Sequence, residues 1–478
     1  MNASLLVIIG LPFVAAGVLA FIPGFRLASV VNALVALVMF IAGLSLLVQP
    51  RFAGDYFIID DVNILFVILN TLVGFTTSVF SASYIAHELE TGKLTPTLLR
   101  FYHAMFMAMM GAMNLALTAN NIGLLWVGLE LATLITVVMV GIYRTPAAIE
   151  AAWKYFILGS VGISLAFFGT ILIYLAGQAP LGEGIPAMTW TRLLAAAPQL
   201  DVSLLNLAFI FLLVGYGTKV GLAPLHAWLP DAHAEGPTPV SAVLSGLLLN
   251  VALYALLRFK MIVGANPQAV DPGPVMMVMG LLSLIFAAFM LYQRRDIKRL
   301  FAYSSIEHMG LIVFAFGLGS SLANFAGLLH MAMHSLTKSA IFFAVGHIAQ
   351  VKGTQRLSGI RGLTVTHPAL AVALAAGVFA ISGLPPFGVF MSEFLIITTT
   401  FAKAPWLAVF PVFGLIVALG ALLMRLQDIL FGEPSGPALP VQASYGPLAL
   451  HLLLVLVAGL FLPSAVSGWL ERAAELLR

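Results

Sequence analysis

A lysine lies inside a long apolar stretch of this 478-residue chain, at Lys219 within residues 203–258. A charged amine at membrane depth is costly, so it needs a partner, a water-filled cavity or a function. Pro224 follows five residues later, and a proline in a membrane helix removes one backbone donor and frees a carbonyl one turn earlier. The stretch therefore places a titratable amine beside a predicted helix break, a combination that indicates ion handling.

Glu130 is the acidic residue that best matches this lysine, because it lies in the middle of the apolar segment 121–143. Burial disfavours the charged carboxylate unless a cation is close, and Lys219 is the candidate cation. Two interpretations stay open, a structural ion pair that pins two helices and a proton site coupled to a movable lysine. The second is favoured, because a permanently fixed pair is a poor use of two groups that are costly in lipid.

His330, His334 and Lys338 follow one another at four-residue spacing inside the apolar segment 323–349. On a helix they share one face, one turn or about 6 Å apart. Titratable groups at this spacing suit proton transfer through intervening water. Histidines four residues apart also suit a metal, but no acid or cysteine lies nearby on that helix and the third member is a lysine. Proton transfer is therefore favoured, and the lone His347 farther along is interpreted as structural.

Glu393 is the ionisable residue of a second interrupted segment, 369–400, which breaks at Pro385-Pro386. Residues 203–230 and 369–400 are both long, interrupted by Gly and Pro, and carry one buried ionisable group. They are the seventh and twelfth predicted spans. Interrupted segments at corresponding places in two halves indicate inverted repeats with ion sites at the midplane, and an odd offset inverts the topology as such repeats require.

The polar hinge after Lys219 offers four more candidates. They could form a cytoplasmic funnel through which protons enter, or they could belong to a solvated loop with helix caps. These residues are His226, Asp231, His233 and Glu235.

Glu307 and His308, in AYSSIEHMG, directly follow the basic loop QRRDIKRL. They are candidates for a proton relay, with pairing between Glu307 and that loop as the alternative. Asp60, Asp61, Glu88 and Glu90 flank another apolar segment and are expected at the surface.

Composition identifies the class of protein that must position these residues. The chain is 61% hydrophobic and 9% charged, against about 25% charged in soluble domains, with a mean hydropathy of +1.06. This indicates an all-α polytopic membrane protein. No cysteine is present, which excludes disulfides, thiolate metal sites and iron–sulfur clusters on this chain. A net charge of +3 does not suggest nucleic-acid binding.

About fourteen spans are predicted, since a span needs about 20 apolar residues. They are 3–22 (interpreted as retained rather than a cleaved signal), 27–49, 62–85, 99–118, 121–143, 153–176, 203–228, 240–262, 274–292, 300–318, 323–349, 369–400, 405–430 and 446–470. Segments 323–349 and 369–400 are expected to be interrupted, and 177–202 to form a small ordered cap. No strands are expected, and no dinucleotide or phosphate-binding glycine motif is present, so no redox catalytic site is predicted on this chain.

Spans 4–8 and 9–13 then form two five-helix inverted repeats, with broken helices at spans 7 and 12. The corresponding units are a three-helix segment 1–98, a first half-channel 99–262, a second half-channel 263–430 and a C-terminal helix 431–478. More Lys and Arg lie in the loops opposite the termini than on the terminus side. Positive residues favour the cytoplasm, so both termini are predicted on the non-cytoplasmic side of an inner membrane.

Several motifs together resemble one family. GTKVGLAPLHAWLPDAHAEGPTPVSAVLSG, the His-His-Lys file and AYSSIEHMG look like the antiporter-like membrane subunits of respiratory complex I, Mrp antiporters and membrane-bound hydrogenases. The similarity covers nearly the whole chain and is closest in kind to the F subunit of hydrogenase-4 and formate-hydrogenlyase-type complexes. In such proteins a glutamate and a lysine pair across spans five and seven, and a file on span eleven leads to an ionisable group on span twelve. The resemblance implies proton-translocation roles for Glu130, Lys219, His330, His334, Lys338 and Glu393.

One position departs from the family pattern. A lysine or histidine is usual midway along the eighth span, and this chain has Asn250 in SGLLLNVALYALLR, with no titratable group within two turns before Arg258. A simple protonatable link between the two half-channels is therefore in doubt, although Asn250 could order a bridging water.

The resemblance implies a proton-translocating subunit of a complex I-like or group 4 hydrogenase-like redox complex. The expected partners are other membrane subunits, including antiporter-like ones, and lipid. Iron–sulfur clusters, a nickel–iron centre or quinone would belong to partner subunits. Two alternatives stay open, a cation/proton antiporter or inorganic-carbon-uptake subunit without a redox module, and a non-conducting scaffold subunit.

Overall fold

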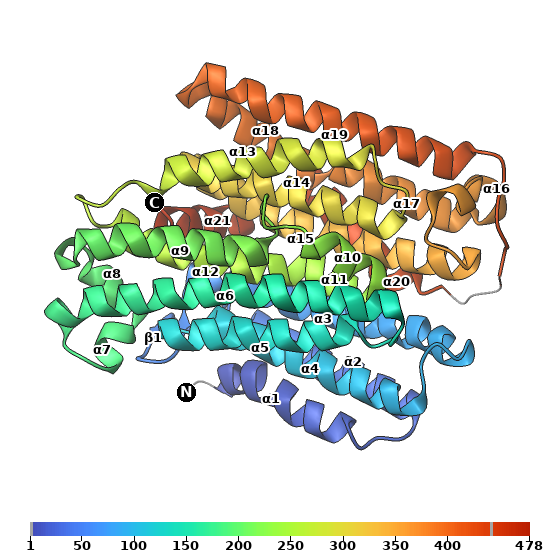
Figure 1. Ribbon diagram of the computed structural model, residues 1–478, viewed down its shortest axis with the longest axis horizontal. Coiled ribbons are helices and arrows are strands. Elements are labelled where there is room, and N and C mark those ends of the chain that lie inside the picture. The colour runs from blue at the N-terminus through green and yellow to red at the C-terminus, as the bar shows by residue number, and fades with distance from the viewer. Residues whose placement is uncertain (1–2, 440–442) are drawn as a thin grey trace.

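The structure is a computed structural model that describes residues 3–439 and 443–478, and it is almost entirely helical. Long helices run side by side along the longest axis of the molecule (Figure 1). The first part of the chain forms α1 (Ala3–Leu19), α2 (Phe25–Ser45) and α3 (Asp61–Glu90). A two-stranded hairpin, β1 (Phe52–Ala53) with β2 (Ile58–Ile59), separates α2 from α3 and pairs Phe52 with Ile59. The expectation of no strands is therefore wrong for this short connection.

Two successive groups of helices follow. The first contains α4 (Pro96–Thr118), α5 (Ile122–Val140), α6 (Pro146–Leu181), α9 (Val202–Val220), α10 (Trp228–Glu235), α11 (Thr238–Val243), the π-helical turn η2 (Leu244–Leu248) and α12 (Leu249–Gly264). The second contains α13 (Pro272–Leu291), α14 (Ile297–Leu318), α15 (Ser321–Lys352), α17 (Pro368–Ile381), α18 (Gly388–Lys403) and α19 (Pro405–Phe431). The chain closes with α20 (Tyr445–Leu460) and α21 (Ser464–Leu476).

Short elements occupy the connections. The predicted cap at 177–202 is present as α7 (Ile185–Met188), α8 (Trp190–Ala195) and the 3-10 turn η1 (Ala197–Gln199). After α15 come the 3-10 turn η3 (Leu357–Gly359) and α16 (Leu363–Thr366).

Polar side chains set where several of these helices begin. Thr95, Thr145 and Asp271 each accept a backbone hydrogen bond from the first turn of the helix that follows, and each precedes a proline at the first helical position. A proline there lacks only an N–H that would have no helical partner. Such caps satisfy the orphan donors of a helix end, which matters where lipid offers no alternative partner.

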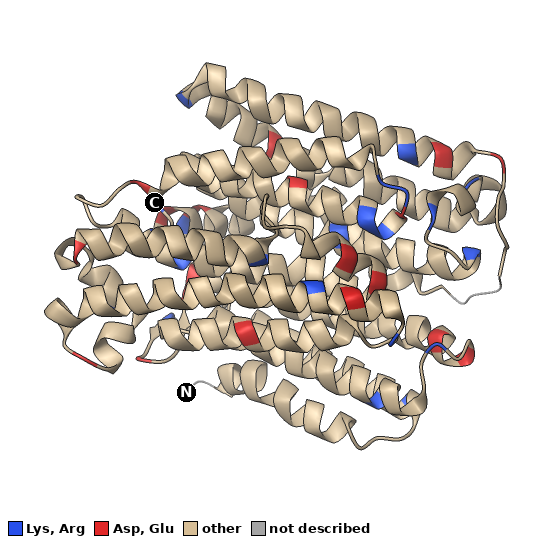
Figure 2. Cartoon of the chain, viewed as in Figure 1, with Lys and Arg blue, Asp and Glu red and all other residues tan. Residues whose placement is uncertain are grey.

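Ten helices among the described residues are long and apolar enough to cross a membrane, or up to eleven when a bent pair counts as one span. Figure 2 shows that charged residues are sparse along most of the helices. The bent pair is α20 and α21, which meet at 85°. The single span predicted at 446–470 is therefore divided by a sharp bend, because Pro463 interrupts the apolar run.

The three predicted interruptions have different outcomes. Segment 369–400 is broken between α17 and α18, and the stretch after Lys219 is broken between α9 and α10. The peptide bonds preceding Pro224 and Pro386 are both cis. Segment 323–349 is not interrupted, since α15 is one continuous helix of 32 residues. The expectation of a break there is wrong, because this segment contains no proline and its internal glycines are accommodated within the helix.

The interior of the bundle consists of three helical segments. The apolar windows of α11–α12, α14 and α15 are completely buried within the protein, whereas those of α2, α13 and α19 are only 33–39% buried. Lipid-facing helices therefore surround a protein-lined centre. Buried polar side chains can be satisfied there by other protein groups, as membrane depth requires.

Candidate functional site

Lys219 and Glu130 form a buried ion pair between α9 and α5. The Lys219 Nζ atom lies 3.8 Å from Glu130 Oε2, and the lysine side chain is 1% exposed. The Glu130 side chain is 17% exposed. The ammonium also lies 5.9 Å from the centre of the Tyr155 ring, an arrangement that favours a cation over an aromatic face. The pair is thus buried on its lysine side and reachable on its glutamate side.

The end of α9 positions this lysine. The helix stops one residue later at Val220, and Gly221 adopts the left-handed conformation, with φ of 81°. Trp228, the first residue of α10, donates from its indole nitrogen to the Thr218 carbonyl at 2.8 Å. The same indole stacks on Tyr155 with ring centres 4.1 Å apart. The break predicted from Pro224 is therefore held together by specific side-chain contacts next to Lys219.

Gly159 on α6 provides the space for the lysine. A methyl group at this position would lie 3.0 Å from Lys219 Nζ, closer than carbon and nitrogen normally approach without a shift. The absence of a side chain at Gly159 thus allows the ammonium to reach its position near Glu130.

The file predicted on α15 is completely buried. His330, His334 and Lys338 are all 0% exposed. Lys338 Nζ donates to the Phe301 carbonyl of α14 at 3.1 Å. His334 has no hydrogen-bond partner among the described residues, so its two ring nitrogens are open to a water or a transferred proton. The three groups face helices α14 and α18 rather than lipid.

His330, the first residue of the file along α15, contacts a second group of titratable residues. His330 Nε2 lies 3.0 Å from His308 Nδ1, and His330 Nδ1 lies 2.8 Å from the Ser392 hydroxyl. His308 Nδ1 is 3.8 Å from Glu393 Oε1, and its Nε2 is 3.2 Å from Glu307 Oε2. Glu307 is 1% exposed, so it contacts His308 inside the protein and does not pair with the basic loop.

Glu393 occupies a place made by the break between α17 and α18. Gly383 in that break has φ of +63°, and a side chain there would overlap the Glu393 carboxylate. A residue other than glycine would meet both a backbone conformation that L-residues rarely adopt and this overlap. The break therefore presents the acid to His308.

The structure also defines which residues could hold a metal. Ligand atoms of His308, His330 and Glu393 lie within 4.8 Å of one another. Two imidazoles and one carboxylate are a donor set that zinc accepts. The set differs from the His330–His334 pair considered from spacing, because consecutive turns of α15 bring His330 next to α14 and α18 while His334 lies one turn away.

Asn250 connects the first half of the chain to this file. Its amide nitrogen donates to the Ser335 hydroxyl at 2.6 Å and to the Met331 carbonyl at 3.3 Å, both on α15. The π-helical turn Leu244–Leu248 precedes it, and such turns often occur at functional sites. Position 250, where the resemblance led us to expect a titratable group, thus carries a polar contact between α12 and the centre of α15.

The four residues of the predicted funnel do not form one group. Asp231 and Glu235 are partly exposed and pair with Arg299 at 3.1 and 3.3 Å. His233 is fully buried and stacks on Phe342, with ring centres 4.8 Å apart. The other histidine, His226, is 8% exposed and packs against Phe286 at 4.8 Å. One turn of α10 therefore directs its carboxylates to the surface and its histidine to the interior.

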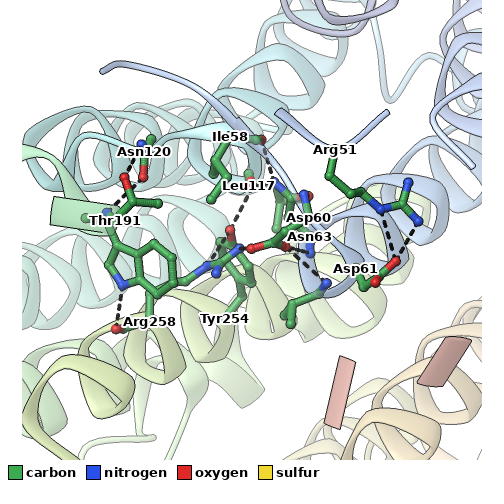
Figure 3. Close-up of polar contacts among 12 residues, drawn as sticks. Arg51, Ile58, Asp60, Asp61, Asn63, Leu117, Asn120, Thr191, Tyr254 and Arg258 are labelled. Atoms are coloured by element: carbon green, nitrogen blue, oxygen red, sulfur yellow. Dashed lines mark hydrogen bonds and ion pairs between the residues drawn. The ribbon is translucent and has the colours of Figure 1, made fainter. Parts of the chain in front are cut away.

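Two acids that were expected at the surface lie against the protein interior, Asp60 partly buried and Glu88 buried. Asp60 was expected at the surface, but its Oδ2 lies 2.6 Å from Arg258 Nη2, and the Arg258 side chain is 3% exposed. Figure 3 shows the pair between α12 and the start of α3, beside Tyr254. Tyr254 accepts from Arg258 Nε at 2.9 Å and donates to the Leu117 carbonyl at 2.9 Å. Arg258 lies within the predicted span 240–262, and that location was the signal that a counter-ion should exist.

Glu88 is the second correction, since it is 1% exposed rather than at the surface. Its Oε1 accepts from Gln350 Nε2 at 2.9 Å. From sequence, a glutamate at the end of an apolar segment cannot be distinguished from a solvated one, because the residue that buries it is 262 positions away.

Comparison with known proteins shows the family of this chain. The family model described as NADH:quinone oxidoreductase/Mrp antiporter, TM, matches residues 119–418. The chain is 57% identical over 467 residues to the hydrogenase-4 component F homolog of Methylacidiphilum infernorum (isolate V4), covering 98% of each chain.

Solved structures share the fold. A chain of the membrane-bound sulfane sulfur reductase, an archaeal respiratory membrane complex, superposes with a TM-score of 0.89 at 23% identity, covering 99% of this chain and 97% of the other. A chain of respiratory complex I from Thermus thermophilus gives a TM-score of 0.82 at 23% identity, covering 99% and 100%. The resemblance inferred from the motifs is confirmed, and the chain belongs to the NADH:quinone oxidoreductase/Mrp antiporter family of membrane proteins.

Proposed function

We propose that this chain is the proton-translocating membrane subunit of a complex I-like or group 4 hydrogenase-like redox complex. The observation that carries the proposal is the buried Lys219–Glu130 pair, 3.8 Å apart, in a bundle whose centre also contains the α15 file. Buried ionisable groups in a membrane protein are costly and mark ion pathways. Apart from position 250, the buried ionisable groups expected from the resemblance are all present from α5 to α18, which supports conduction more than a scaffold role.

The Lys219–Glu130 pair couples a charge change in a neighbouring subunit to the release of a proton. Glu130 is partly exposed, so a charge change in a neighbouring subunit acts on it first. When Glu130 is drawn away or neutralised, the positive charge on Lys219 loses its compensation and the ammonium releases its proton. When Glu130 returns, Lys219 takes up a proton again.

The released proton moves toward the α15 file. Asn250 contacts Ser335, which lies between His334 and Lys338 on that helix, and orders water between the two halves. Lys338, His334 and His330 then pass the proton to His308 and Glu393, from which it leaves. Moving a unit charge across 100 mV requires about 2.3 kcal/mol, so a few kcal/mol of redox energy suffices per proton.

The helices divide in a way that supports two inverted repeats. Helices α4, α5, α6, α9–α10 and α11–α12 form the first unit, which runs from Pro96 to Gly264 and corresponds to the predicted 99–262. Helices α13, α14, α15, α17–α18 and α19 form the second, from Pro272 to Phe431, which corresponds to the predicted 263–430, and each unit has its broken helix at the fourth place. With α1–α3 and the bent α20–α21, this division gives the fourteen predicted spans.

The remaining assignments follow from membrane sidedness and composition. Both termini lie on the non-cytoplasmic side of the inner membrane, opposite the Lys- and Arg-rich loops. The partners are other membrane subunits, including antiporter-like ones. Electron carriers such as iron–sulfur clusters, a nickel–iron centre or quinone belong to those partners, since this chain has no cysteine.

The test is a Lys219→Ala variant in the whole complex reconstituted into vesicles. We expect assembly and electron transfer to continue while proton translocation is lost. Lys154→Ala is the matched control, because that lysine is 48% exposed in the N-terminal part of α6, and it should pump normally. Unchanged pumping by an assembled Lys219→Ala complex would contradict the proposal, and sodium transport without an electron donor would replace it with cation/proton exchange.

A further inference from the structure

A polar pocket lies at the end of the bundle away from both termini and is not used by the pathway above. Its volume is about 460 Å³, and its lining includes Tyr84, Glu88, Tyr143, Glu235 and Lys298. A pocket of this size has room for several water molecules, each of which needs two to four polar partners. The lining supplies two acids, two lysines (Lys298 and, at the rim, Lys93) and two phenols, so water in the pocket can contact ionisable groups that face the protein interior.

Glu88 forms the acidic side of this pocket. It is 1% exposed and accepts from the Gln350 amide at 2.9 Å, while Lys93 lies 3.5 Å from the same oxygen at the open rim. The Lys93 side chain is 56% exposed. The carboxylate thus accepts from a neutral amide on the inside and pairs with an exposed lysine on the outside. A fixed structural ion pair would instead place a buried cation directly on the acid.

Lys298 forms the opposite side and contacts the helix that carries His233. It is 1% exposed, and its Nζ donates to the carbonyls of Gly236 at 2.8 Å and Ala234 at 3.4 Å. These carbonyls end α10, where a cation is favourable. Lys298 therefore fixes the last turn of α10 and with it His233, which immediately precedes Ala234 in the chain.

His233 lies between the Lys298 side of the pocket and helix α15. Neither ring nitrogen of His233 has a hydrogen-bond partner among the described residues. Its ring lies nearly parallel to Phe342, 12° apart, at a centre distance of 4.8 Å. Phe342 is four residues after Lys338 on α15, hence one turn away on the same face. The imidazole therefore stands between the pocket wall and the end of the α15 file.

We propose that this pocket is the proton inlet of the α15 file, with Glu88 as the acceptor of protons from bulk water and His233 as the group that passes them toward Lys338. The inlet rests on the proposed function. A hydronium ion protonates the Glu88 carboxylate, and pocket water carries the proton to one nitrogen of His233. The other nitrogen then releases a proton toward Lys338, so the imidazole returns to its neutral form. Lys298 acts as a positioning residue that holds α10.

The first test compares Glu88→Gln with Glu90→Gln in the reconstituted whole complex. Glutamine keeps the size of the side chain but cannot be protonated and released, whereas Glu90 is exposed two residues away and serves as the matched control. We expect the proton-to-electron ratio to fall several-fold in Glu88→Gln, to remain normal in Glu90→Gln and to recover in Glu88→Asp. An unchanged ratio in an assembled Glu88→Gln complex would overturn the inlet.

A second test avoids any change to a buried residue. Because the chain has no cysteine, Lys93→Cys gives it a single thiol at the pocket rim. A bulky membrane-impermeant thiosulfonate should lower proton translocation in that complex, and a reductant should restore it. Glu90→Cys treated in the same way, and the unsubstituted complex, should not respond. Equal responses of Lys93→Cys and Glu90→Cys would contradict the inlet.

Lys219→Ala separates the two proposals. If Lys219→Ala stops pumping while Glu88→Gln and labelled Lys93→Cys pump normally, the pocket is not the inlet and the proposed function stands. If pumping continues unchanged in Lys219→Ala as well, the proposed function fails and the inlet fails with it.

Discussion

Uncharged neighbouring residues determine the position of the buried charge on Lys219. Lys219 reaches Glu130 because Gly159 leaves room for its ammonium and because Trp228 fixes the end of α9. The position of a proton-carrying group therefore depends on its neighbours to within a few tenths of an ångström. Substitutions at these neighbours test the site without removing a titratable group.

Gly159→Ala should displace Lys219, because the new methyl group would lie 3.0 Å from Nζ. We expect an assembled complex whose pumping rate falls several-fold, measured as acidification or alkalinisation of vesicles per electron transferred. Gly17→Ala is the control, since a methyl group at that helical position meets nothing within 4 Å. Equal pumping by the two variants would show that the Lys219 position is not critical.

Asp60→Asn should destabilise the protein by about 3 kcal/mol, because removing one partner of a buried ion pair leaves the other uncompensated. Asparagine can still accept the backbone hydrogen bonds that Asp60 Oδ1 receives at the start of α3, so the change isolates the charge on Arg258. The readout is the melting temperature of the purified complex in detergent. The exposed Asp55–Arg192 pair is the control, and Asp55→Asn should cost less than about 1 kcal/mol.

Sequence reasoning identified the charges in the middle of apolar segments and missed those at their ends. Glu130, Lys219 and the file on α15 stand out because the apolar segments around them carry no other charged residue. Asp60 and Glu88 do not, because an acid at a segment end is expected to be a cap or a solvated residue. Their partners, Arg258 and Gln350, are distant in sequence, so only the packing of the whole chain reveals them.

At the scale of elements, breaks in helices create the sites. The break between α9 and α10 presents Lys219, and the break between α17 and α18 presents Glu393. Gly and Pro made both breaks predictable. Their internal contacts were not predictable, since the indole of Trp228 bonds back across the break to Thr218 and stacks on a third helix through Tyr155.

Trp228→Phe should weaken the first break. The Thr218 carbonyl would lose its 2.8 Å indole donor and keep only the Gly221 N–H at 3.2 Å, and a typical hydrogen bond contributes about 0.5–1.5 kcal/mol. We expect a lower melting temperature together with slower pumping. Trp153→Phe removes the same indole from a side chain that is 59% exposed and should leave both measurements near normal. A similar loss in both variants would mean that the effect reflects tryptophan removal in general.

Asn250→Leu tests the connection between the two halves. Leucine fills similar space but cannot donate to Ser335 or order water, so proton transfer from the Lys219 side to α15 should slow several-fold while assembly is kept. Asn250→His, which restores the kind of residue usual in the family, should retain pumping or increase it. Full pumping by Asn250→Leu would show that protons do not cross at this contact.

The whole molecule is a set of interior helices enclosed by lipid-facing ones, and its function depends on neighbours that this chain does not contain. Glu130 is the pathway residue nearest to the outside, with 17% exposure, so a partner subunit should pack on or near α5. Composition established the membrane class and the lack of cysteine, whereas it carries no information about which membrane subunits are the partners of this chain.

Purification of the tagged protein from native membranes in mild detergent should recover other membrane subunits together with a redox subunit. Mass spectrometry of the recovered complex is the measurement. A nickel–iron large subunit would fix the assembly as hydrogenase-like, and a quinone-reductase set would fix it as complex I-like. Recovery of the chain with antiporter subunits alone would contradict a redox complex.

Because α15 is one continuous helix, its length limits which insertions and deletions the protein can accept during evolution. Its 32 residues span about 48 Å at 1.5 Å per residue, and its faces meet α3, α11, α14, α17, α18, α20 and α21. Inserting one residue would turn everything beyond it by about 100°, separating His330 from His308 or Lys338 from Phe301. A substitution in α15 affects only the contacts of one residue, whereas a change in the length of the helix would disrupt all contacts beyond that point. Among diverging descendants, insertions and deletions should therefore accumulate in the connecting turns and be absent from this helix.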